Sequence, residues 1–434
     1  MNDQIKHVKI GVVGLGYVGL PLAIEFGKVR KVRGFDVNQE RVKQIKKGLD
    51  STHEVPQAAF DEAKFLDVTS FIGDLKSCNF YIIAVPTPVD DANNPDLAHL
   101  ISATRTVGSV LSAGDIVVFE STVFPGVTEE VCAPILEEVS GLKHCDVEFN
   151  TETDVFHLGY SPERINPGDK KRGIRDIVKI TSGSNNYAAS LINSIYASII
   201  SAGTHLAESI KVAEAAKVIE NIQRDVNIAL VNELAIIFER LDIDTHAVLS
   251  AAGTKWNFAR FSPGLVGGHC IGIDPYYLAY KAQQVGYTPD LILAGRRMNN
   301  EMAGFVANKL IKLMLSKSID VSQSKVLILG LAFKENCSDL RNSKVFDLID
   351  ELGGYLCDVE VFDPLIDQNF SSSKKGYKMI TEPKLGNYDA IVLAVPHDFF
   401  VKLGSFDIRK WGKPRSVLFD LKSVFKKSES DGRL

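Results

Sequence analysis

The stretch Gly14-Leu15-Gly16-Tyr17-Val18-Gly19-Leu20-Pro21 decides the fold of the first part of the chain. A β-branched apolar run, His7 to Val13, precedes it, and a helical pattern, Leu22 to Phe26, follows it. Gly14 permits a tight turn, Gly16 lets a pyrophosphate approach the backbone, and Gly19 allows close helix packing. The start of the helix offers unpaired amides to phosphates. The order strand, glycine turn, helix therefore predicts a dinucleotide-binding Rossmann unit.

A carboxylate follows at the expected distance. A second predicted strand, residues 32–35, ends at Asp36, about 20 residues beyond the glycines, where an acid binds the ribose hydroxyls. Because that acid disfavours a 2′-phosphate, we expect NAD rather than NADP. The alternative is a glycine turn in an α/β domain that binds no cofactor.

Two further apolar runs, residues 80–85 and 116–119, predict strands that are buried on both faces of a parallel sheet. Ligands bind such sheets beyond the carboxyl ends of the strands. Thr87, Glu120 and Thr122 follow these runs, so we expect them where cofactor and substrate meet. Turn formation and helix capping are their alternative roles.

The composition is that of a globular protein with about three domains, given 434 residues of which 45% are hydrophobic and 24% charged. No run approaches the roughly 20 apolar residues of a membrane span, and the first residues lead straight into a strand without a signal segment, so we expect a cytoplasmic protein. A net charge of −5 gives no sign of nucleic-acid binding. The six cysteines form no Cys-x-x-Cys pair, which fits a reducing compartment and argues against disulfides or a structural zinc.

The middle of the chain predicts one long helix, because residues 205–241 contain neither Gly nor Pro and carry apolar residues at spacings of three or four. A helix of that length extends on the order of 50 Å, so we expect it to link domains and to supply a dimer surface. Lys217 and Asn221 share a face of it, within a turn of Glu214. A solvated polar stripe is the alternative interpretation of this face.

The opening pattern partly returns after residue 320. Residues 325–334, 359–363 and 390–396 echo residues 10–14, 32–36 and 82–86, which predicts a second Rossmann-like sheet without the complete phosphate fingerprint. Two such domains imply a second nucleotide-like ligand, such as a substrate that carries a nucleotide; architectural repetition alone is the alternative. Arg341 suits a bidentate contact with a phosphate or carboxylate, although an exposed loop explains its cluster with Lys334 and Asp339 equally well.

We therefore expect an α/β protein with two Rossmann-like parallel-sheet domains, joined by a long central helix and a helical dimerisation domain. The predicted bounds are 1–203 for the NAD-binding domain, 204–305 for the central helical domain and 320–434 for the second Rossmann-like domain.

A thiol lies in the glycine-hinged loop from Gly267 to Pro275, far downstream of the cofactor motif. A redox cofactor combined with a nucleophile indicates chemistry in two stages. Oxidation of an alcohol to an acid gains from trapping the intermediate aldehyde on sulfur, whereas a simple alcohol oxidation needs no thiol. Cys270 is the candidate trap, and a small buried core thiol is the alternative.

Several motifs in order resemble one family, the nucleotide-sugar 6-dehydrogenases, which comprise the UDP-glucose and GDP-mannose dehydrogenases. The resemblance covers nearly the whole chain and is carried by residues 14–21, 120–123, 161–168, 214–217 with Asn221, 267–274 and 330–334 with 339–341. It implies that a UDP-sugar is oxidised at C6 from the hydroxymethyl to the carboxylate, with two NAD and one water consumed. It also implies that the long helix forms the core of a homodimer. We expect no metal.

The resemblance assigns roles residue by residue. Cys270 captures the C6 aldehyde as a thiohemiacetal that becomes a thioester, and Lys217 and Asn221 stabilise the oxyanions. Asp274 works with Lys217 and an ordered water in proton transfer. Glu163 is the base of thioester hydrolysis, and Thr122 helps to position water.

The predicted binding residues fall into two groups, those for NAD and those for the substrate. The expected NAD contacts are Gly14, Gly16, Tyr17, Val18, Gly19, Asp36, Arg41, Pro86, Thr87, Glu120, Thr122 and Arg341. The expected substrate contacts are Glu163, Arg164, Ile165, Asn166, Lys217, Asn221, Arg260, Gly267, Phe333 and Lys334.

The substrate subclass depends on two departures. Many UDP-glucose enzymes carry Ser-Pro-Glu-Phe-Leu and Cys-Leu-Pro-Lys-Asp, whereas this chain has residues 161–168 with Arg164 and Asn166, and a thiol loop with Gly272 and Ile273. These features resemble the branch acting on UDP-GlcNAc or UDP-GalNAc, which feeds capsule and O-antigen synthesis; UDP-glucose and UDP-ManNAc are the alternatives. Arg164 and Asn166 are then candidates near the sugar, with capping or turn roles as the alternative.

Relatives place a basic residue before the thiol loop, in some cases across the dimer, and Arg260 is favoured over Lys255 for it. Two remote alternatives stay open for the whole chain. One is a two-electron dehydrogenase of the β-hydroxyacid type, and the other is a non-catalytic NAD-binding protein.

Overall fold

The computed structural model describes residues 5–52, 54–147, 153–165, 172–268, 271–367 and 376–434. The chain forms two compact units, the first comprising Met1–Glu220 and Tyr276–Tyr287 and the second Asn221–Pro275 and Thr288–Leu434. The predicted central domain, 204–305, is not a unit of its own in this division. Its long helix contributes residues to both.

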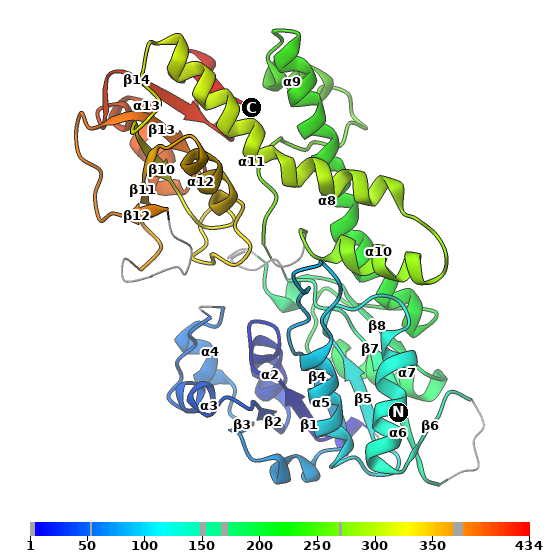
Figure 1. Ribbon diagram of the computed structural model, residues 1–434. Coiled ribbons are helices and arrows are strands. Elements are labelled where there is room, and N and C mark those ends of the chain that lie inside the picture. Colours follow the sequence, from blue (N-terminus) through cyan, green and yellow to red (C-terminus); the bar gives the residue numbers. More distant parts are fainter. Residues whose placement is uncertain (1–4, 53, 148–152, 166–171, 269–270, 368–375) are drawn as a thin grey trace. The chain divides into compact units, whose positions relative to one another are not determined.

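The first unit is built on a sheet with the strand order β3-β2-β1-β4-β5-β7-β8-β9, with β6 beside β7 (Figure 1). The paired strands are parallel except for β7 and β8. The carboxyl ends of β1, β4, β5 and β7 therefore lie along one edge, where the predicted site residues follow the strands. The strands are β1 (Ile10–Val13), β2 (Val32–Phe35), β3 (Leu66–Thr69), β4 (Phe80–Ile83), β5 (Ile116–Phe119), β6 (Lys143–His144), β7 (Val155–Tyr160), β8 (Lys179–Gly183) and β9 (Thr204–Leu206).

Helices cover both faces of this sheet (Figure 1). Ile10 and Val12 of β1 pack in one apolar cluster with residues of the first helix, α2, and of α7. Phe26 of α2 meets Tyr196 of α7 edge to face, with ring centroids 5.6 Å apart. The helices are α2 (Gly19–Val29), α3 (Gln39–Lys46), α4 (Gln57–Glu62), α5 (Ala98–Gly108), α6 (Ala133–Ser140), α7 (Asn186–Ala197) and α10 (Asp274–Gln284), with short turns η1 (Ile72–Ser77), η2 (Thr128–Cys132) and η3 (Ile174–Asp176).

The second unit contains a six-stranded parallel sheet of order β12-β11-β10-β13-β14-β15. The predicted repeat is confirmed, because β10, β11 and β13 take the places of β1, β2 and β4. The strands are β10 (Lys325–Leu329), β11 (Asp358–Phe362), β12 (Tyr377–Met379), β13 (Tyr388–Leu393), β14 (Gly412–Asp420) and β15 (Gly432–Arg433), and the helices are α9 (Thr245–Ala252), α11 (Asp290–Ser316), α12 (Val345–Gly354), α13 (Asp398–Arg409) and η4 (Lys427–Glu429).

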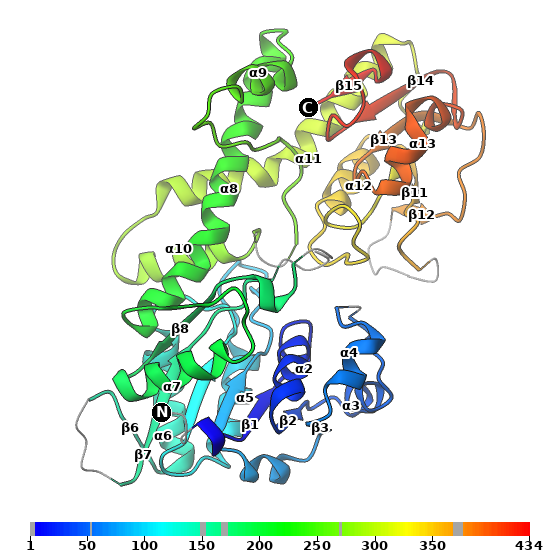
Figure 2. The same cartoon turned by 180° about the vertical axis from the view of Figure 1, so that it is seen from behind.

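Strand β10 shows why its sequence is apolar throughout. Val326 and Ile328 pack with α11 and α12 on one face, whereas Leu327 and Leu329 pack with α13 on the other (Figure 2). Because successive side chains of a strand point to opposite faces, a strand covered on both sides needs an apolar residue at every position.

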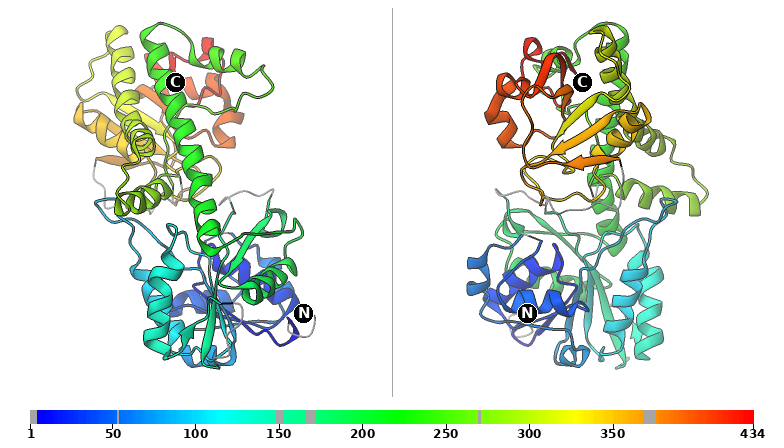
Figure 3. Two further views of the ribbon diagram at one scale, coloured as in Figure 1. Left: turned by 90° about the vertical axis from the view of Figure 1, so that its right-hand side faces the viewer. Right: turned by 60° about the vertical axis from the view of Figure 1, so that its left-hand side comes forward.

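The long helix α8 (Ile210–Arg240) is continuous over 31 residues (Figure 3). It begins five residues later than predicted, because His205 and Leu206 pair with β8 as strand β9 and the Ser209 hydroxyl then accepts a hydrogen bond from the Val212 amide at 3.2 Å. Several of its apolar residues are exposed in the single chain, namely Val212, Ile219, Leu230 and Ile237.

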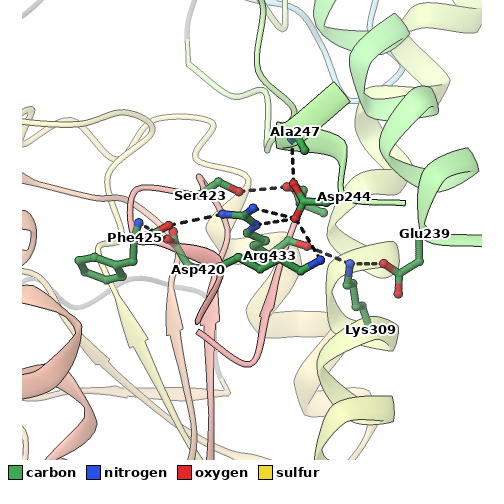
Figure 4. Close-up of polar contacts among 10 residues, drawn as sticks. Glu239, Asp244, Ala247, Lys309, Asp420, Ser423, Phe425 and Arg433 are labelled. Carbon is green, nitrogen blue, oxygen red and sulfur yellow. Dashed lines mark hydrogen bonds and ion pairs between the residues drawn. The ribbon is translucent and has the colours of Figure 1, made fainter. Parts of the chain in front are cut away.

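The last strand ties the second sheet to the turn between α8 and α9 (Figure 4). The Arg433 guanidinium donates to Asp244 Oδ2 through Nε at 3.0 Å and Nη2 at 2.7 Å. Asp244 also caps α9 by accepting from the Ala247 amide at 2.8 Å, and Lys309 of α11 donates to the Arg433 carbonyl at 2.9 Å. These contacts tie the start of α9 and helix α11 to β15.

Over the described ranges, no helix is long and apolar enough to cross a membrane. Nor do these ranges bring together three or more His, Cys, Asp or Glu side chains that could hold a metal ion.

Candidate active site

The three glycines of the first turn differ in what surrounds them. Gly14 has a φ of +90°, and a Cβ there would lie 2.6 Å from the Ala84 carbonyl oxygen. A Cβ at Gly19 would lie 1.8 Å from the Gly14 carbonyl oxygen, whereas one at Gly16 would meet no described atom within 4 Å. Gly14 and Gly19 are therefore required by the fold of the turn, and Gly16 leaves its open side to a ligand.

The Asp36 carboxylate is bound to this turn. Its Oδ2 accepts from the Leu15 amide and its Oδ1 from the Asn38 amide, both at 2.8 Å. Arg41 is buried and supports the same segment, because its Nε donates to the Leu15 carbonyl at 2.8 Å while Nη2 pairs with Asp50 at 2.7 Å. Arg41, a predicted NAD contact, thus supports the turn through a hydrogen bond from its side chain to the Leu15 backbone.

The residues present fit a dinucleotide. Helix α2 starts directly after the turn, and its N-cap residue Val18 provides no side-chain cap. The Leu20 amide donates to the Gly16 carbonyl at 3.1 Å and Pro21 has no amide hydrogen, so the Gly19 amide is the first-turn donor placed for a phosphate. Tyr17 next to it is half-buried, and Pro86 beyond β4 is exposed. Asp36 retains acceptor capacity at the end of β2, where a ribose would lie.

The segments beyond β4 and β5 are joined by hydrogen bonds. Thr87 Oγ1 donates to the Thr122 carbonyl at 2.7 Å, and the Ser121 hydroxyl donates to the Val85 carbonyl at 2.7 Å. The Tyr277 hydroxyl donates to the Thr87 carbonyl at 2.9 Å. Thr87 therefore positions Thr122, whose side chain is half-buried at this edge of the sheet.

Glu120, which was expected to contact NAD, has its side chain engaged inside the first unit. Glu120 is only 1% exposed, and its two carboxylate oxygens are taken by Lys179 Nζ at 2.7 Å and by the Tyr196 hydroxyl at 2.5 Å. Burial raises the pKa of Glu120, while the ammonium of Lys179 opposes that rise. The sequence did not single out Lys179, and the only signal was a lysine at the start of an otherwise buried strand.

Glu163 follows β7 and is buried, and its two carboxylate oxygens differ in their hydrogen bonds. Its Oε1 accepts from the amides of Arg164, at 2.6 Å, and of Ile165. Its Oε2 is buried and has no hydrogen-bond partner among the described residues. This oxygen is available to accept a hydrogen bond from a ligand or water.

Arg164 is already engaged near this carboxylate. Its Nη1 donates to the Val178 carbonyl at 2.6 Å, and its Nη2 pairs with Glu220 of α8 at 2.7 Å. The neighbouring predicted contact, Asn166, lies outside the described residues.

The polar stripe of α8 is buried, so its interpretation as a solvated face was wrong. Lys217 and Asn221 are each 6% exposed, and Glu214 is fully buried. Glu214 accepts from the amides of Gly126 at 2.5 Å and Thr128 at 2.9 Å. Burial raises the pKa of Glu214 to about 7 against these hydrogen bonds, which lower it.

Cys270 lies outside the described residues, but both flanks of its loop are anchored. On one side the Gly268 amide donates to the Asn342 carbonyl at 3.2 Å. A Cβ at Gly267 would lie 2.4 Å from that carbonyl, and one at Gly268, with φ +89°, would lie 2.7 Å from the Phe333 ring. On the other side the Asn221 side-chain amide donates to Asp274 Oδ2 at 2.6 Å.

The loop that holds Gly268 follows the second glycine turn. Gly330 has a φ of +86°, and Asp363 Oδ2 accepts from the Leu331 amide at 2.7 Å, as Asp36 does in the first unit. Here, however, His397 is buried on the carboxylate, with Nε2 at 3.1 Å from Asp363 Oδ2. The Asn336 amide donates to His397 Nδ1 at 2.9 Å, which places the proton of the neutral ring on Nε2.

The other residues predicted in this loop are held within it. The Lys334 ammonium lies 5.4 Å from the Phe333 ring centroid, and Arg341 pairs with Asp339 at 2.7 Å. Arg341, predicted as an NAD contact, is thus a neighbour of the Gly268 anchor in the second unit.

Arg260 lines a cavity of about 300 Å³ in the second unit. Its Nη2 donates to the Gly253 carbonyl at 2.8 Å, which orients the guanidinium. The lining also includes Lys422, two residues beyond β14, and His246 of α9. Burial lowers the pKa of Lys422. The rule that ligands bind beyond strand carboxyl ends could have identified this lysine.

The order of these features along the chain is matched by one family over nearly its whole length. Its NAD binding domain matches residues 8–200, its central domain residues 211–301 and its UDP binding domain residues 327–427. The chain belongs to the UDP-glucose/GDP-mannose dehydrogenase family.

Relatives within the family match from end to end. A UDP-N-acetyl-D-glucosamine 6-dehydrogenase of Salmonella typhi is 57% identical over 99% of this chain and 99% of its own length. One of Pseudomonas aeruginosa is 55% identical over 99% of this chain and 100% of its own. The solved structure of a UDP-D-ManNAc dehydrogenase from Pyrococcus horikoshii is 32% identical, covers 97% of this chain and 96% of its own, and superposes with a TM-score of 0.85.

Family membership makes the protein an NAD-dependent nucleotide-sugar dehydrogenase. This activity agrees with the two Rossmann-like sheets, with the open glycine turn of the first unit, and with the UDP binding domain matched at residues 327–427.

Proposed function

We propose that this dehydrogenase oxidises C6 of a UDP-N-acetylhexosamine, UDP-N-acetylglucosamine foremost, from the hydroxymethyl to the carboxylate, for polysaccharide synthesis. The contact between Asn221 and Asp274 carries the proposal, because it ties the buried polar face of α8 to the loop that bears Cys270. The end-to-end similarity to two UDP-N-acetyl-D-glucosamine 6-dehydrogenases supports the substrate.

The overall change converts the alcohol, two NAD⁺ and one water into the carboxylate, two NADH and three protons. NAD, when bound, accepts the two hydrides that leave C6. Between the two oxidations the Cys270 thiolate adds to the aldehyde carbon and gives a thiohemiacetal, whose oxidation leaves a thioester. Water then adds to the thioester carbonyl, the C–S bond breaks, and the thiol is released.

The buried side chains suit these steps. An ammonium at Lys217 and the side-chain amide of Asn221 donate hydrogen bonds to oxygen on C6 as negative charge develops there, and preorganised donors of this kind contribute a few kcal/mol each. Asp274 holds the Asn221 amide in place and exchanges protons with Lys217 through water. Glu163 takes the proton of the attacking water on its unpartnered Oε2.

The second unit is proposed to bind the nucleotide of the substrate. Its cavity beside Arg260 and Lys422 presents two cationic side chains to a diphosphate. The loop with Phe333 and Lys334 is joined to the start of the thiol loop by the hydrogen bond from the Gly268 amide to the Asn342 carbonyl.

We further propose a homodimer through α8. Four apolar side chains of this helix, Val212, Ile219, Leu230 and Ile237, are between 43% and 53% exposed in the single chain. Apolar residues repeated along one long helix are more typical of a subunit interface than of a solvated surface.

Counting NADH released per sugar, across UDP-Glc, UDP-GlcNAc, UDP-GalNAc, UDP-ManNAc and GDP-Man, tests the proposal. We expect two NADH per UDP-N-acetylhexosamine and lower kcat/KM for the other sugars. One NADH per sugar would indicate the two-electron β-hydroxyacid type, and no turnover with any sugar would indicate a non-catalytic NAD-binding protein.

A further inference from the structure

A charged cluster is buried behind the two segments that carry Thr122 and Glu163. It consists of Glu120, Lys179 and Tyr196, whose exposed fractions are 1%, 3% and 0%. They come from the end of β5, the start of β8 and helix α7, so the first sheet brings together three distant parts of the chain. Lys179 Nζ also lies 5.3 Å from the centroid of the Tyr196 ring.

This cluster is poorly explained as a source of stability. Removing an ammonium and a carboxylate from water costs several kcal/mol per ion, and apolar residues of similar volume often serve equally well or better. A buried ion pair is, however, directional, because each donor and acceptor must be satisfied in one arrangement.

The third contact of Lys179 shows what is arranged. Besides Glu120, its Nζ donates to the Pro162 carbonyl at 2.9 Å. Pro162 immediately precedes Glu163, whose Oε1 is held by the two amides that follow it. The backbone is therefore fixed on both sides of the Glu163 carboxylate, and Oε2 is left with no described partner.

The cluster also reaches the water-positioning segment. Glu120 is followed by Ser121 and Thr122, and the Tyr160 hydroxyl donates to the Ser121 carbonyl at 3.2 Å. The Ser161 amide donates to the Phe119 carbonyl at 2.9 Å, joining the ends of β5 and β7. A change in the Lys179–Glu120 pair thus acts on Thr122 and Glu163 together.

We propose that Lys179, held by Glu120 and Tyr196, is a positioning residue for the hydrolytic step, which sets the Glu163 carboxylate and the Thr122 segment for attack of water on the thioester. The proposal rests on the proposed function, because it presupposes a thioester on Cys270. It leaves both oxidations to other residues.

The test separates oxidation from hydrolysis. Lys179→Met leaves Glu120 as a buried unpaired charge, so the principal variant is Lys179→Met/Glu120→Gln, which removes both charges. Lys143→Met, an exposed strand lysine of the same unit, is the matched control. Each protein is mixed with NAD and UDP-GlcNAc, the rapid NADH burst and the steady-state rate are recorded, and the quenched enzyme is weighed by intact-mass spectrometry.

We expect the double variant to keep the NADH burst while its steady-state rate falls roughly 100-fold, the usual contribution of a general base, and the thioester to accumulate on the enzyme. Hydroxylamine, a nucleophile that needs no general base to cleave a thioester, should restore its turnover. It should not restore that of Cys270→Ser.

Three results would overturn the inference. The double variant turns over like Lys143→Met, or its burst and steady-state rate fall together without a thioester, which is the behaviour of a scaffold residue. In the third case the parent enzyme releases only one NADH per sugar, or the variant Glu163→Gln accumulates no thioester. That result overturns the proposed function itself and the inference with it.

Discussion

Replacing Gly16 by alanine separates cofactor binding from folding of the turn. A Cβ at this position meets no described atom within 4 Å, and Gly16 is not among the glycines with positive φ, so the backbone accepts alanine. Without cofactor, the free energy of unfolding of Gly16→Ala should lie within about 0.5 kcal/mol of that of the parent. The added methyl instead occupies the side from which a pyrophosphate approaches.

The loss of NAD affinity follows from the hydrogen bonds that the methyl prevents. Charged phosphate oxygens accept backbone N–H bonds at about 2.8 Å, and a methyl carbon cannot come that close. Losing one or two such bonds costs about 1.5–3 kcal/mol each. A total of about 3 kcal/mol raises the Kd for NAD by roughly 100-fold.

Calorimetric titration with NAD and with UDP-GlcNAc, next to a thermal scan without ligands, measures this. Gly19→Ala is the contrasting variant, because its Cβ would lie 1.8 Å from the Gly14 carbonyl oxygen and the turn itself must move. We expect Gly19→Ala to lower the melting temperature and Gly16→Ala to leave it unchanged. Parent-like NAD affinity of Gly16→Ala would refute the assignment of this turn to the cofactor.

Three further outcomes are expected. Cys270→Ser, with a weaker nucleophile, should lose the second oxidation and hold the sugar as an aldehyde or adduct, and near-normal acid production would exclude covalent catalysis. Asp36→Ala should weaken NAD binding far more than UDP-sugar binding, since it removes the ribose acceptor and releases the Leu15 amide; an equal loss of both affinities would make Asp36 purely structural. Burial raises the pKa of Glu214 from 4.5 to about 7, so the folded protein favours the protonated carboxyl. The stability that this preference contributes is complete below pH 4.5 and is lost as the pH rises through 7. Between pH 5 and 8 the free energy of unfolding should therefore fall by about 2.5 kcal/mol less for Glu214→Gln than for the parent. Denaturant unfolding measures this difference, and identical pH profiles would contradict the raised pKa of Glu214.

The fold was largely predictable because its signals are local. The glycine turn, the apolar runs and the unbroken helical period each depend on residues close in sequence, and they located β1, β2, β4, β5, α8 and the second sheet. The start of α8 was missed, since pairing of residues 204–206 with β8 is a contact between distant segments. The division into two units was not predicted either, because a continuous helix hides the point at which its neighbours change.

The candidate site divides in the same way. By itself the sequence determined which residue types are present and in what order: a dinucleotide turn, a carboxylate at Asp36, a thiol loop and a polar face with Lys217 and Asn221. Only the tertiary structure decided what each one contacts, that this polar face is buried, that Glu120 pairs with Lys179, and that His397 covers the second carboxylate. The physical reason is that burial and hydrogen-bond pairing arise between segments that lie far apart in the chain, and no local pattern records them. Asp363 and His397 are separated by 34 residues, Glu120 and Lys179 by 59, and Gly126 and Glu214 by 88.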